Sequence, residues 1–396
     1  MDIYNLNIAI IHEWFLSNSF GGAEKVTIEL DKYLSENFSK PDLFSLVEDI
    51  SKLDENFLGN RKINTSLIQK LPFGTKKIQQ YLPLIPFAIE QLELNNYDLI
   101  ISSSHLSAKG VLTSPEQLHI SYVHTPMRYA WDQMNTYIKH SILRKFGMEF
   151  FLRYILFKMR KWDFLSGQRP DFLIANSNFT ARRIKKYWGL KSEVIFPPVN
   201  VELFDFSQER ENFYLSVNRL VPNKRVDLLV STFNKLGLPL FIIGEGPEKE
   251  KLKKLANPNI KFLGKESNKN IIQLMSRCRA FVYAGVEDFG IAPVEAIASG
   301  APVIALGKGG LLDTVNCLNN CSKNKIPTGI LFKKQTESDI TNAISWFEDN
   351  KIWKKFNSKD MNNFAQKFNT NNFNLKMGKF INLALEKFNK EDNIIF

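Results

Sequence analysis

The sequence predicts an α/β protein built from two doubly wound domains. Its 396 residues exceed what one hydrophobic core usually serves, so two domains are expected. Short apolar, β-branched runs alternate with helical patterns, as in a mostly parallel sheet covered by helices on both faces. This alternation begins near residue 7 and begins again near residue 213.

The first half of the chain contains four runs typical of buried strands. They are NIAIIH (7–12), DLIISSS (98–104), HISYVH (119–124) and DFLIANS (171–177). After the first run, apolar residues with helical spacing predict a helix on the sheet. Near residue 198 the chain reads FPPVN, a rigid turn that suits a domain boundary. We therefore expect the first domain to span residues 1–199.

The second half repeats the pattern, and we expect its domain to span residues 200–370. Its strand-like runs are FYLSVNR (213–219), PLFIIGEG (239–246), IKFLG (260–264), AFVYAG (280–285), PVIAL (302–306) and TGILF (328–332). Beyond them, Phe373, Met377 and Ile381 form an apolar stripe at helical spacing. This stripe predicts a C-terminal helix, residues 371–396, that packs back on the first domain.

Composition excludes several classes of protein. The chain is 44% hydrophobic and 23% charged without a low-complexity tract, which indicates a globular fold. Cys278, Cys317 and Cys321 make no disulfide framework, and without a nearby histidine pair they predict packing rather than a metal site. We find no secretory signal and no uninterrupted apolar run of about 18 residues. A cytoplasmic location is therefore expected.

The formal charge of +11 is concentrated in one part of the chain. Residues 141–190 hold eleven Lys and Arg against three acidic residues, a net charge of +8. Within them, segment 143–162 mixes cations with Phe, Leu, Ile and Trp, as helices that lie in a membrane interface do. A basic helix packed on the first sheet is the alternative. A nucleic-acid-binding role is disfavoured because no RNA or DNA module is recognisable.

Glycines follow the first strand-like run. In SFGGAEK, Gly21 and Gly22 precede a helix, where their amides can approach an anionic ligand closely. A plain strand–helix turn uses glycine in the same way. The stretch is not GxGxxG, and no acidic residue ends an evident second strand about 20 residues on, so binding of NAD is disfavoured.

Two cations lie close together in the next motif. SVNRLVPNKRVD (216–227) has Arg219 at the end of a predicted strand and Lys224 at the start of a predicted helix. A cation near a helix N-terminus is unfavourable unless an anion is bound there. Together the two cations suit a diphosphate, although two ordinary surface cations remain the alternative.

The stretch EDFGIAPVE (287–295) combines two carboxylates with a helix start. Pro293 fits the first turn, and the amides around Gly290 and Ile291 are expected to point outward at the helix N-terminus. Glu287 precedes the helix and Glu295 lies within it, so the two carboxylates can accept hydrogen bonds from different sets of hydroxyls. A nucleotide sugar offers such a layout: sugar hydroxyls, a diphosphate and a ribose diol.

These motifs, taken together, resemble those of the retaining glycosyltransferases of family 4. The resemblance in the second half is carried by Arg219, Lys224, GEGP (244–247), E-x7-E and a second glycine loop, GKGGLLDTV (307–315). In the first half it is carried by GGAE (21–24), SYVHTPMRYAWD (121–132) and IANSNFTARRIKKYWG (174–189). HTPMRYAWD resembles the branch containing mannosyltransferases of bacterial O-antigen and exopolysaccharide assembly. Asp313 and Val123 depart from the family pattern, where glutamate and cysteine are frequent.

The resemblance implies the GT-B fold, two Rossmann-like domains facing each other across a cleft, and it implies roles for matching residues. Arg219 and Lys224 would neutralise the departing diphosphate. Glu295 would hold the ribose diol, and Glu287 would orient the donor sugar. His124 is similar to the family's active-site histidine, and Arg128 is a candidate for an acceptor or donor phosphate. The implied catalytic residues are His124, Arg219, Lys224 and Glu287, and the implied donor-binding residues are Gly21, Gly22, Phe289, Gly290, Ile291 and Glu295. His12 and His105 are interpreted as structural.

The implied function is a hexosyltransferase that uses a nucleotide sugar, GDP-mannose in the first instance. The acceptor would be a saccharide or a polyprenyl-diphosphate-linked saccharide in surface polysaccharide (lipopolysaccharide) biosynthesis. No convincing metal-binding DxD is present, and the cationic pair makes a metal unnecessary, so no metal and no other cofactor are expected. No nucleic-acid partner is expected either, and the expected position is the cytoplasm, including the inner face of the cell membrane. A GT-B-like nucleotide-sugar epimerase and a non-enzymatic basic protein that binds RNA or lipid are the alternatives. E-x7-E with Arg219 and Lys224 favours transfer.

Overall fold

The computed structural model describes residues 6–17, 21–50, 61–141, 144, 146–320 and 325–392. The chain divides into two compact units. Unit 1 contains Met1–Phe196 and Asn374–Phe396, and unit 2 contains Pro197–Phe373. Cys321 lies outside the described residues, as do residues 143 and 145 of the basic segment.

Unit 1 is built on a parallel sheet with the strand order β3-β2-β1-β4-β5-β6-β7. Its strands are β1 (Ile8–Phe15), β2 (Asp42–Glu48), β3 (Ile63–Thr65), β4 (Leu99–Ser104), β5 (Leu118–Val123), β6 (Phe172–Ala175) and β7 (Glu193–Val194). The central strands β1, β4 and β5 are almost completely buried, because helices cover both faces of the sheet.

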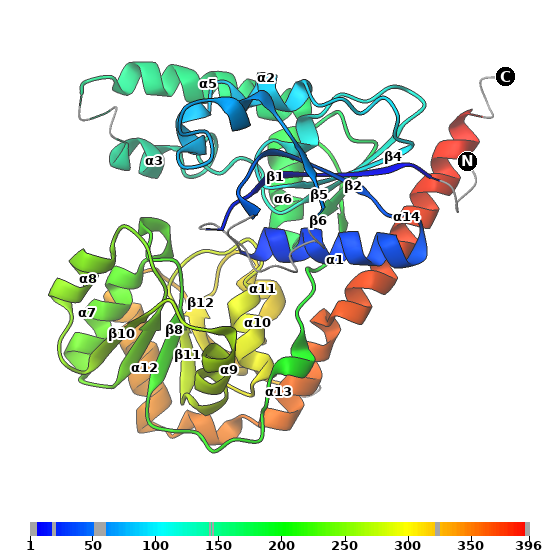
Figure 1. The fold of residues 1–396 in the computed structure, drawn as a ribbon. Helices are drawn as coiled ribbons and strands as arrows, with labels where there is room; N and C mark the ends of the chain where they lie inside the picture. The colour runs from blue at the N-terminus through cyan, green and yellow to red at the C-terminus, as the bar shows by residue number, and fades with distance from the viewer. Residues whose placement is uncertain are drawn as a thin grey trace. The chain divides into compact units, whose positions relative to one another are not determined.

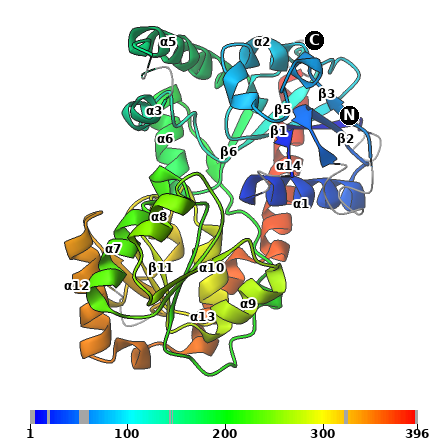
Figure 2. The same ribbon diagram turned by 60° about the vertical axis from the view of Figure 1, so that its left-hand side comes forward.

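The helices of unit 1 lie on both faces of this sheet. They are α1 (Gly22–Asn37), α2 (Ile85–Glu90), α3 (Met134–His140), α5 (Glu149–Ser166), α6 (Asn178–Trp188) and the greater part of α14 (Thr370–Asp392). Figures 1 and 2 show α1 on one face and α2 on the other. α14 packs on α1, where Gly378 leaves room for the Tyr33 hydroxyl; a Cβ at this position would lie 1.9 Å from it.

Unit 2 repeats the architecture with the strand order β10-β9-β8-β11-β12-β13, again parallel. Its strands are β8 (Tyr214–Val217), β9 (Leu240–Ile243), β10 (Ile260–Gly264), β11 (Ala280–Tyr283), β12 (Val303–Leu306) and β13 (Gly329–Phe332). Its helices are α7 (Val226–Leu236), α8 (Lys249–Leu255), α9 (Asn268–Arg277), α10 (Ile291–Ala298), α11 (Leu311–Thr314), α12 (Glu337–Asp349) and α13 (Ser358–Ala365). Helices α7 and α12 lie on one face of the sheet, and α9 and α10 on the other (Figures 1 and 2).

The predicted fold class is thus confirmed: both units are parallel sheets covered by helices on two faces. One expectation for unit 1 is wrong, because β2 is a second strand and it does end on an acidic residue, Glu48. The carboxylate of Glu48 accepts a hydrogen bond from the Ile50 amide at 2.8 Å, so it closes the local turn. None of the described helices is long and apolar enough to cross a bilayer.

The strand orders locate one topological switch point in each unit. The first strand of each unit, β1 or β8, is an inner strand. The next two strands along the chain are added on one side of it, and the strands after those are added on its other side. In open parallel sheets, ligands bind beyond the carboxyl ends of the strands at such a switch point. The loops that follow β1 and β4 in unit 1, and β8 and β11 in unit 2, are therefore the places to look for a functional site.

Candidate active site

Arg219 follows β8 at the switch point of unit 2, and its side chain is exposed. The backbone around it is held by the loop after β9, where the Leu220 amide donates to the Glu245 carbonyl at 2.8 Å. Gly244 has φ +134°, and a Cβ there would lie only 1.8 Å from the Asn218 carbonyl oxygen. Glycine is therefore required for this loop to support the backbone on both sides of Arg219.

Lys224 and Glu287 come together although 63 residues separate them in the sequence. Lys224 lies in the short turn before α7, and Glu287 lies in the loop after β11. The Lys224 ammonium donates to Glu287 Oε1, and the Tyr283 hydroxyl donates to the same oxygen. The side chains of Lys224 and Glu287 are 19% and 17% exposed, so this ion pair is largely shielded from solvent yet still open at one side.

The start of α10 lies directly beyond this pair. Gly290 adopts φ +98° as the residue before the helix, Ile291 is the first helical residue, and Pro293 follows in the first turn, as predicted. Amides in the first turn of a helix have no partner within it, so they form an anion-binding end. Glu295 lies one turn further along α10 and is half-buried. The Phe289 ring packs into the core against Phe368, at 5.5 Å between centroids, which leaves its backbone for the site.

The second glycine loop supports the first. The Gly310 amide donates to the Glu287 carbonyl at 2.8 Å, and Gly309 forms a bridge with Glu287. Gly309 has φ +72°, and a Cβ on it would lie 2.3 Å from the same carbonyl oxygen. The loop after β12 therefore fixes the backbone of Glu287, and Asp313 follows it on α11.

In unit 1, His124 follows β5 and is buried, with 8% of its surface exposed. Its Nε2 lies 2.8 Å from Ser103 Oγ, and this hydroxyl accepts from Thr27 Oγ1 of α1 at 2.8 Å. Burial, together with the positive charge of the neighbouring His12 and His105, lowers the pKa of His124 to about 3. His124 is therefore neutral at pH 7, which suits hydrogen bonding to a hydroxyl rather than proton donation.

Glu13, at the end of β1, is fully buried and has not been identified from the sequence. Its Oε1 accepts from Ser104 Oγ and from the four backbone amides of residues 105–108, at 2.8–3.1 Å. Its Oε2 pairs with His105 Nδ1 at 2.9 Å. Burial favours a higher pKa for Glu13, but His105, His12 and the hydrogen bonds outweigh burial and hold the pKa well below its usual value. A carboxylate inside the apolar run IAIIHEWF was the available signal, because buried charges require partners.

His12 and His105 gather around Glu13. Ligand atoms of His12, Glu13 and His105 lie within 4.8 Å of one another, a grouping that a metal ion could use. The protein itself also contacts these side chains: His12 Nδ1 lies 2.9 Å from the Ser103 carbonyl oxygen, and His105 Nδ1 is paired with Glu13 Oε2. The carboxylate pairing raises the pKa of His105 against the effect of its burial. The ion pair between Glu13 and His105 joins the end of β1 to the loop after β4.

Gly21 and Gly22 begin α1 beside this cluster. The Gly21 amide donates to Glu24 Oε2 at 2.8 Å, so the protein's own carboxylate already occupies that amide. Burial alone would raise the pKa of Glu24, but the hydrogen bond and charge of His12 outweigh burial and lower it. Gly22 is the first residue of α1, and its amide points from the helix N-terminus. Of the two predicted glycines, Gly22 is the better placed for an anion.

Arg128 lies in the loop after β5, four residues beyond His124, and is half-buried. The loop is tied to α6, where Arg183 donates to Asp132 at 2.9 Å and to Thr125 Oγ1 at 2.5 Å. The structure thus joins the stretches 121–132 and 174–189, and Thr180 of α6 also donates to the His124 carbonyl at 3.3 Å.

The predicted residues therefore form two groups. In unit 2, Lys224 and Glu287 are in contact beside the start of α10, while Arg219 extends from the neighbouring loop with its side chain exposed. In unit 1, His124 is linked to α1 through Ser103 and Thr27. Each group lies at the carboxyl ends of the strands around its switch point.

Two family models match the chain and together cover most of it. Residues 20–203 match "Glycosyltransferase Family 4", and residues 204–368 match "Glycosyl transferases group 1". Among solved structures, Anabaena HepE in complex with UDP and glucose aligns with a TM-score of 0.67 and 16% identity, over 96% of this chain and 100% of that one. At this identity the likeness shows the fold.

Curated relatives match over shorter regions. The α-1,3/1,6-mannosyltransferase of Kluyveromyces lactis is 25% identical over 240 residues, 46% of this chain and 47% of that protein. A GDP-mannose-dependent monoacylated α-(1-6)-phosphatidylinositol monomannoside mannosyltransferase of Corynebacterium glutamicum is 29% identical over 195 residues, 39% of this chain and 51% of that protein. The chain spans about half the length of these relatives.

Proposed function

Because this chain belongs to the glycosyltransferases of the GT-B fold, we propose that it transfers a hexose from a nucleoside diphosphate sugar to a saccharide acceptor with retention of anomeric configuration. The observation that carries the proposal is the contact of Lys224 with Glu287 beside the N-terminus of α10. A cation and helix amides suit a diphosphate, and the carboxylate suits sugar hydroxyls.

The proposed reaction needs no covalent intermediate. The bond from the anomeric carbon to the diphosphate breaks, and the acceptor oxygen bonds to the same carbon on the same face. The proton of the acceptor hydroxyl passes to the departing diphosphate. Lys224, Arg219 and the α10 amides stabilise the negative charge that grows on that diphosphate, which is where most of the rate enhancement would arise. Neutral His124 would donate a hydrogen bond to a donor-sugar hydroxyl near position 6.

The proposed sugar is mannose and the proposed donor is GDP-mannose. Support comes from the names of the two relatives, one of them GDP-mannose-dependent, and from the HTPMRYAWD stretch. Because HepE was solved in complex with UDP, the donor screen includes uridine nucleotides and their sugars. Thermal shifts with UDP, GDP and ADP, followed by their sugars, select the donor. Release of nucleoside diphosphate only when an acceptor is present separates transfer from epimerisation. The one-bond coupling between C1 and H1 of the transferred sugar reports retention.

The proposed acceptor is a saccharide, free or linked to a polyprenyl diphosphate, in the assembly of a surface polysaccharide. The enzyme would act from the cytoplasm at the inner face of the cell membrane, against an anionic lipid surface. Support comes from the basic, aromatic composition of segment 143–162.

Replacement of Glu295 is expected to affect nucleotide affinity, whereas replacement of Glu287 is expected to affect kcat. Glu295→Ala removes the proposed partner of the ribose diol, so it should weaken binding of the nucleoside diphosphate by about tenfold or more. Glu287→Ala should lower kcat while leaving that affinity nearly unchanged, because its proposed partner is the sugar. Calorimetric titration with the free nucleotide and initial-rate kinetics measure the two effects. The same pattern in both variants would contradict the assignment.

Activity is expected to persist in EDTA, because cationic side chains and helix amides take the place of a metal at the diphosphate. The measurement is the initial rate in excess chelator, with the same enzyme in manganese or magnesium as the reference. A loss of turnover that either metal restores would overturn the metal-independent mechanism.

A further inference from the structure

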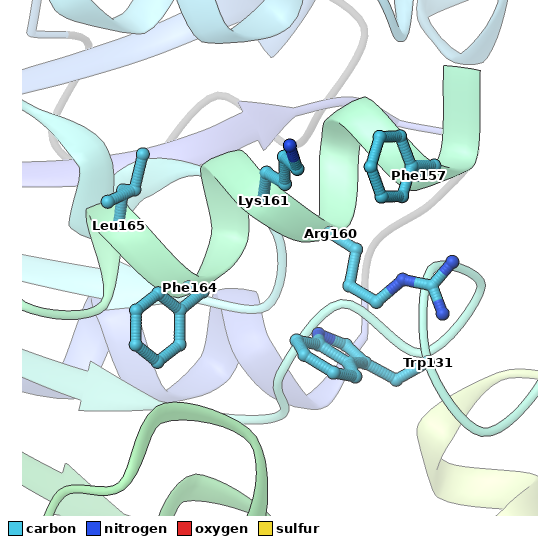
Figure 3. Close-up of a pocket in the computed structure, with 6 residues that line it drawn as sticks. All are labelled: Trp131, Phe157, Arg160, Lys161, Phe164 and Leu165. Atoms are coloured by element: carbon cyan, nitrogen blue, oxygen red, sulfur yellow. The ribbon is translucent and has the colours of Figure 1, made fainter. Parts of the chain in front are cut away.

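A pocket of about 360 Å³ lies between α5 and the loop that follows β5 in unit 1. It is lined by Trp131, Phe157, Arg160, Lys161, Phe164 and Leu165. Figure 3 shows the Arg160 guanidinium and the Phe164 ring reaching from α5 toward the Trp131 indole. Ligand pockets typically measure about 300–1,000 Å³ and combine apolar walls with a few polar groups, a description that this pocket meets.

The wall opposite α5 is fixed by a buried charge network. Trp131 Nε1 donates to Asp163 Oδ2 at 2.7 Å, and the other oxygen of Asp163 pairs with Lys109 at 2.8 Å. Both charges are almost completely buried. The Trp131 ring also stacks on Tyr187, with 4.5 Å between ring centroids and 7° between planes. The pocket is therefore preformed, which lowers the entropic cost of filling it.

Arg160 and Lys161 place positive charge at the edge of the pocket, and the acidic side chains of α5 pair with other cations. Arg160 lies 5.8 Å from the Trp131 centroid, and Lys161 lies 4.6 Å from the Phe157 centroid. The two acidic side chains of α5 are already paired, Glu149 with Arg153 and Asp163 with Lys109. Two cations beside an apolar pocket complement an amphiphile whose head carries phosphate.

The surface around the pocket is apolar along the outer side of α5. The helix buries one face, including Leu152, Leu156 and Met159, and exposes other large side chains, with Phe150 at 85% and Leu165 at 60%. Half of the large apolar side chains that are exposed in the described chain fall between residues 146 and 165. A protein partner would favour an interface poor in lysine, whereas aromatic residues mixed with lysine and arginine are typical of a lipid interface.

We infer that the pocket between Trp131 and α5 binds one hydrocarbon chain of a phosphate-bearing lipid, with Arg160 and Lys161 at its phosphate. Phe157, Phe164 and Leu165 belong both to the pocket and to the exposed side of α5, so a chain can enter it from a lipid surface. A polyprenyl diphosphate carrier belongs to this class of lipid. The inference rests on the proposed function for the role of the lipid as carrier of the acceptor, but the binding of the lipid in the pocket does not depend on that function.

The experiment uses dioctanoyl phosphatidic acid below its critical micelle concentration, so that no bilayer is present. Calorimetry of the full chain is expected to give saturable binding at one site. Phe164→Ser removes apolar contact inside the pocket and should weaken binding at least about tenfold. Phe150→Ser is the matched control, because Phe150 lies on the same helix, is more exposed and does not line the pocket. Arg160→Ala should weaken the binding of dioctanoyl phosphatidic acid but leave the affinity for dioctanoylglycerol, which has no phosphate, unchanged.

Four results would overturn the inference: no saturable binding, equal losses in Phe164→Ser and Phe150→Ser, competition by inorganic phosphate alone, or a dimer that Phe164→Ser dissociates. Each of the first three results would show that the pocket does not recognise the hydrocarbon chain of the lipid. The fourth would show that a second copy of the protein occupies the pocket. Binding of a nucleoside diphosphate and transfer to a water-soluble acceptor are measured in parallel. Lipid binding without transfer would reject the proposed function and keep the lipid site, and the reverse result would do the opposite.

Discussion

Lys224→Ala is expected to lower kcat by about 10²–10³-fold, the usual cost of removing one charge-stabilising donor from a transition state. The ammonium has its largest effect when the diphosphate departs, so kcat should fall more than affinity for the donor sugar. The substitution also leaves the Glu287 carboxylate without its cation, and the remaining negative charge would face the diphosphate. Initial rates with the selected donor, together with the dissociation constant of its nucleotide, measure both effects.

The contact with Glu287 makes this result testable in a second way. The double variant Lys224→Ala with Glu287→Gln removes that stranded negative charge, so its affinity for the nucleoside diphosphate should recover toward that of the parent. Lys261→Ala is the control, because Lys261 is an exposed lysine on the edge strand β10 and should leave kcat unchanged. A kcat for Lys224→Ala within about threefold of the parent would remove Lys224 from the mechanism.

Glu13→Ala is expected to destabilise unit 1 by about 3–5 kcal/mol, the range seen when one partner of a buried ion pair is removed. The substitution strands the four amides of residues 105–108 and the Ser104 hydroxyl in the interior. Thermal unfolding gives the size of the loss, and hydrogen exchange of the segment after β4 gives its location. Glu36→Ala on the exposed side of α1 is the control. Unchanged exchange protection in residues 105–108 would contradict the assigned role.

The pH dependence of Glu13→Gln provides a check that survives if the alanine variant fails to fold. Since the folded pKa of Glu13 is depressed, its contribution to stability is fully present above the unfolded value of about 4.3 and is lost as pH falls through the folded value. The difference in Tm between the parent and Glu13→Gln should therefore be large at pH 6 and narrow on acidification below about pH 4. A difference that is constant with pH would show that the charge of Glu13 does not matter.

The repeated alternation of strand and helix predicted the fold, because each apolar run is long enough to be identified as a strand from its local sequence. The runs at 98–104 and 260–264 coincide closely with β4 and β10. Strand β2 was missed, although it is buried, because Ser45 and the flanking acidic residues interrupt its apolar pattern. Burial of Ser45 is possible because its hydroxyl donates to the Val47 carbonyl at 3.1 Å, an interaction that no periodicity reveals.

The candidate site was predicted in its parts but not in its contacts. E-x7-E and the turn before α7 indicated Glu287 and Lys224 separately, and only the folded chain brings their side chains together over 63 residues. The role of Glu13 depends on the loop after β4, more than 90 residues away. The occupation of the Gly21 amide by Glu24 is a local contact, and the acidic residue three positions after the glycine was its signal.

The course of α14 has a consequence for how the protein is made. The helix begins at Thr370 in unit 2, and from Asn374 onward it belongs to unit 1, so the whole of unit 2 interrupts unit 1 in the chain. A ribosome that adds about 5–20 residues per second delivers all of unit 2 before the segment that covers Tyr33 of α1. During that interval the apolar surface of α1 lacks its cover. Unit 2 can therefore fold first, although most of unit 1 precedes it in the chain, and unit 1 is exposed to chaperones and proteases until α14 has been synthesised.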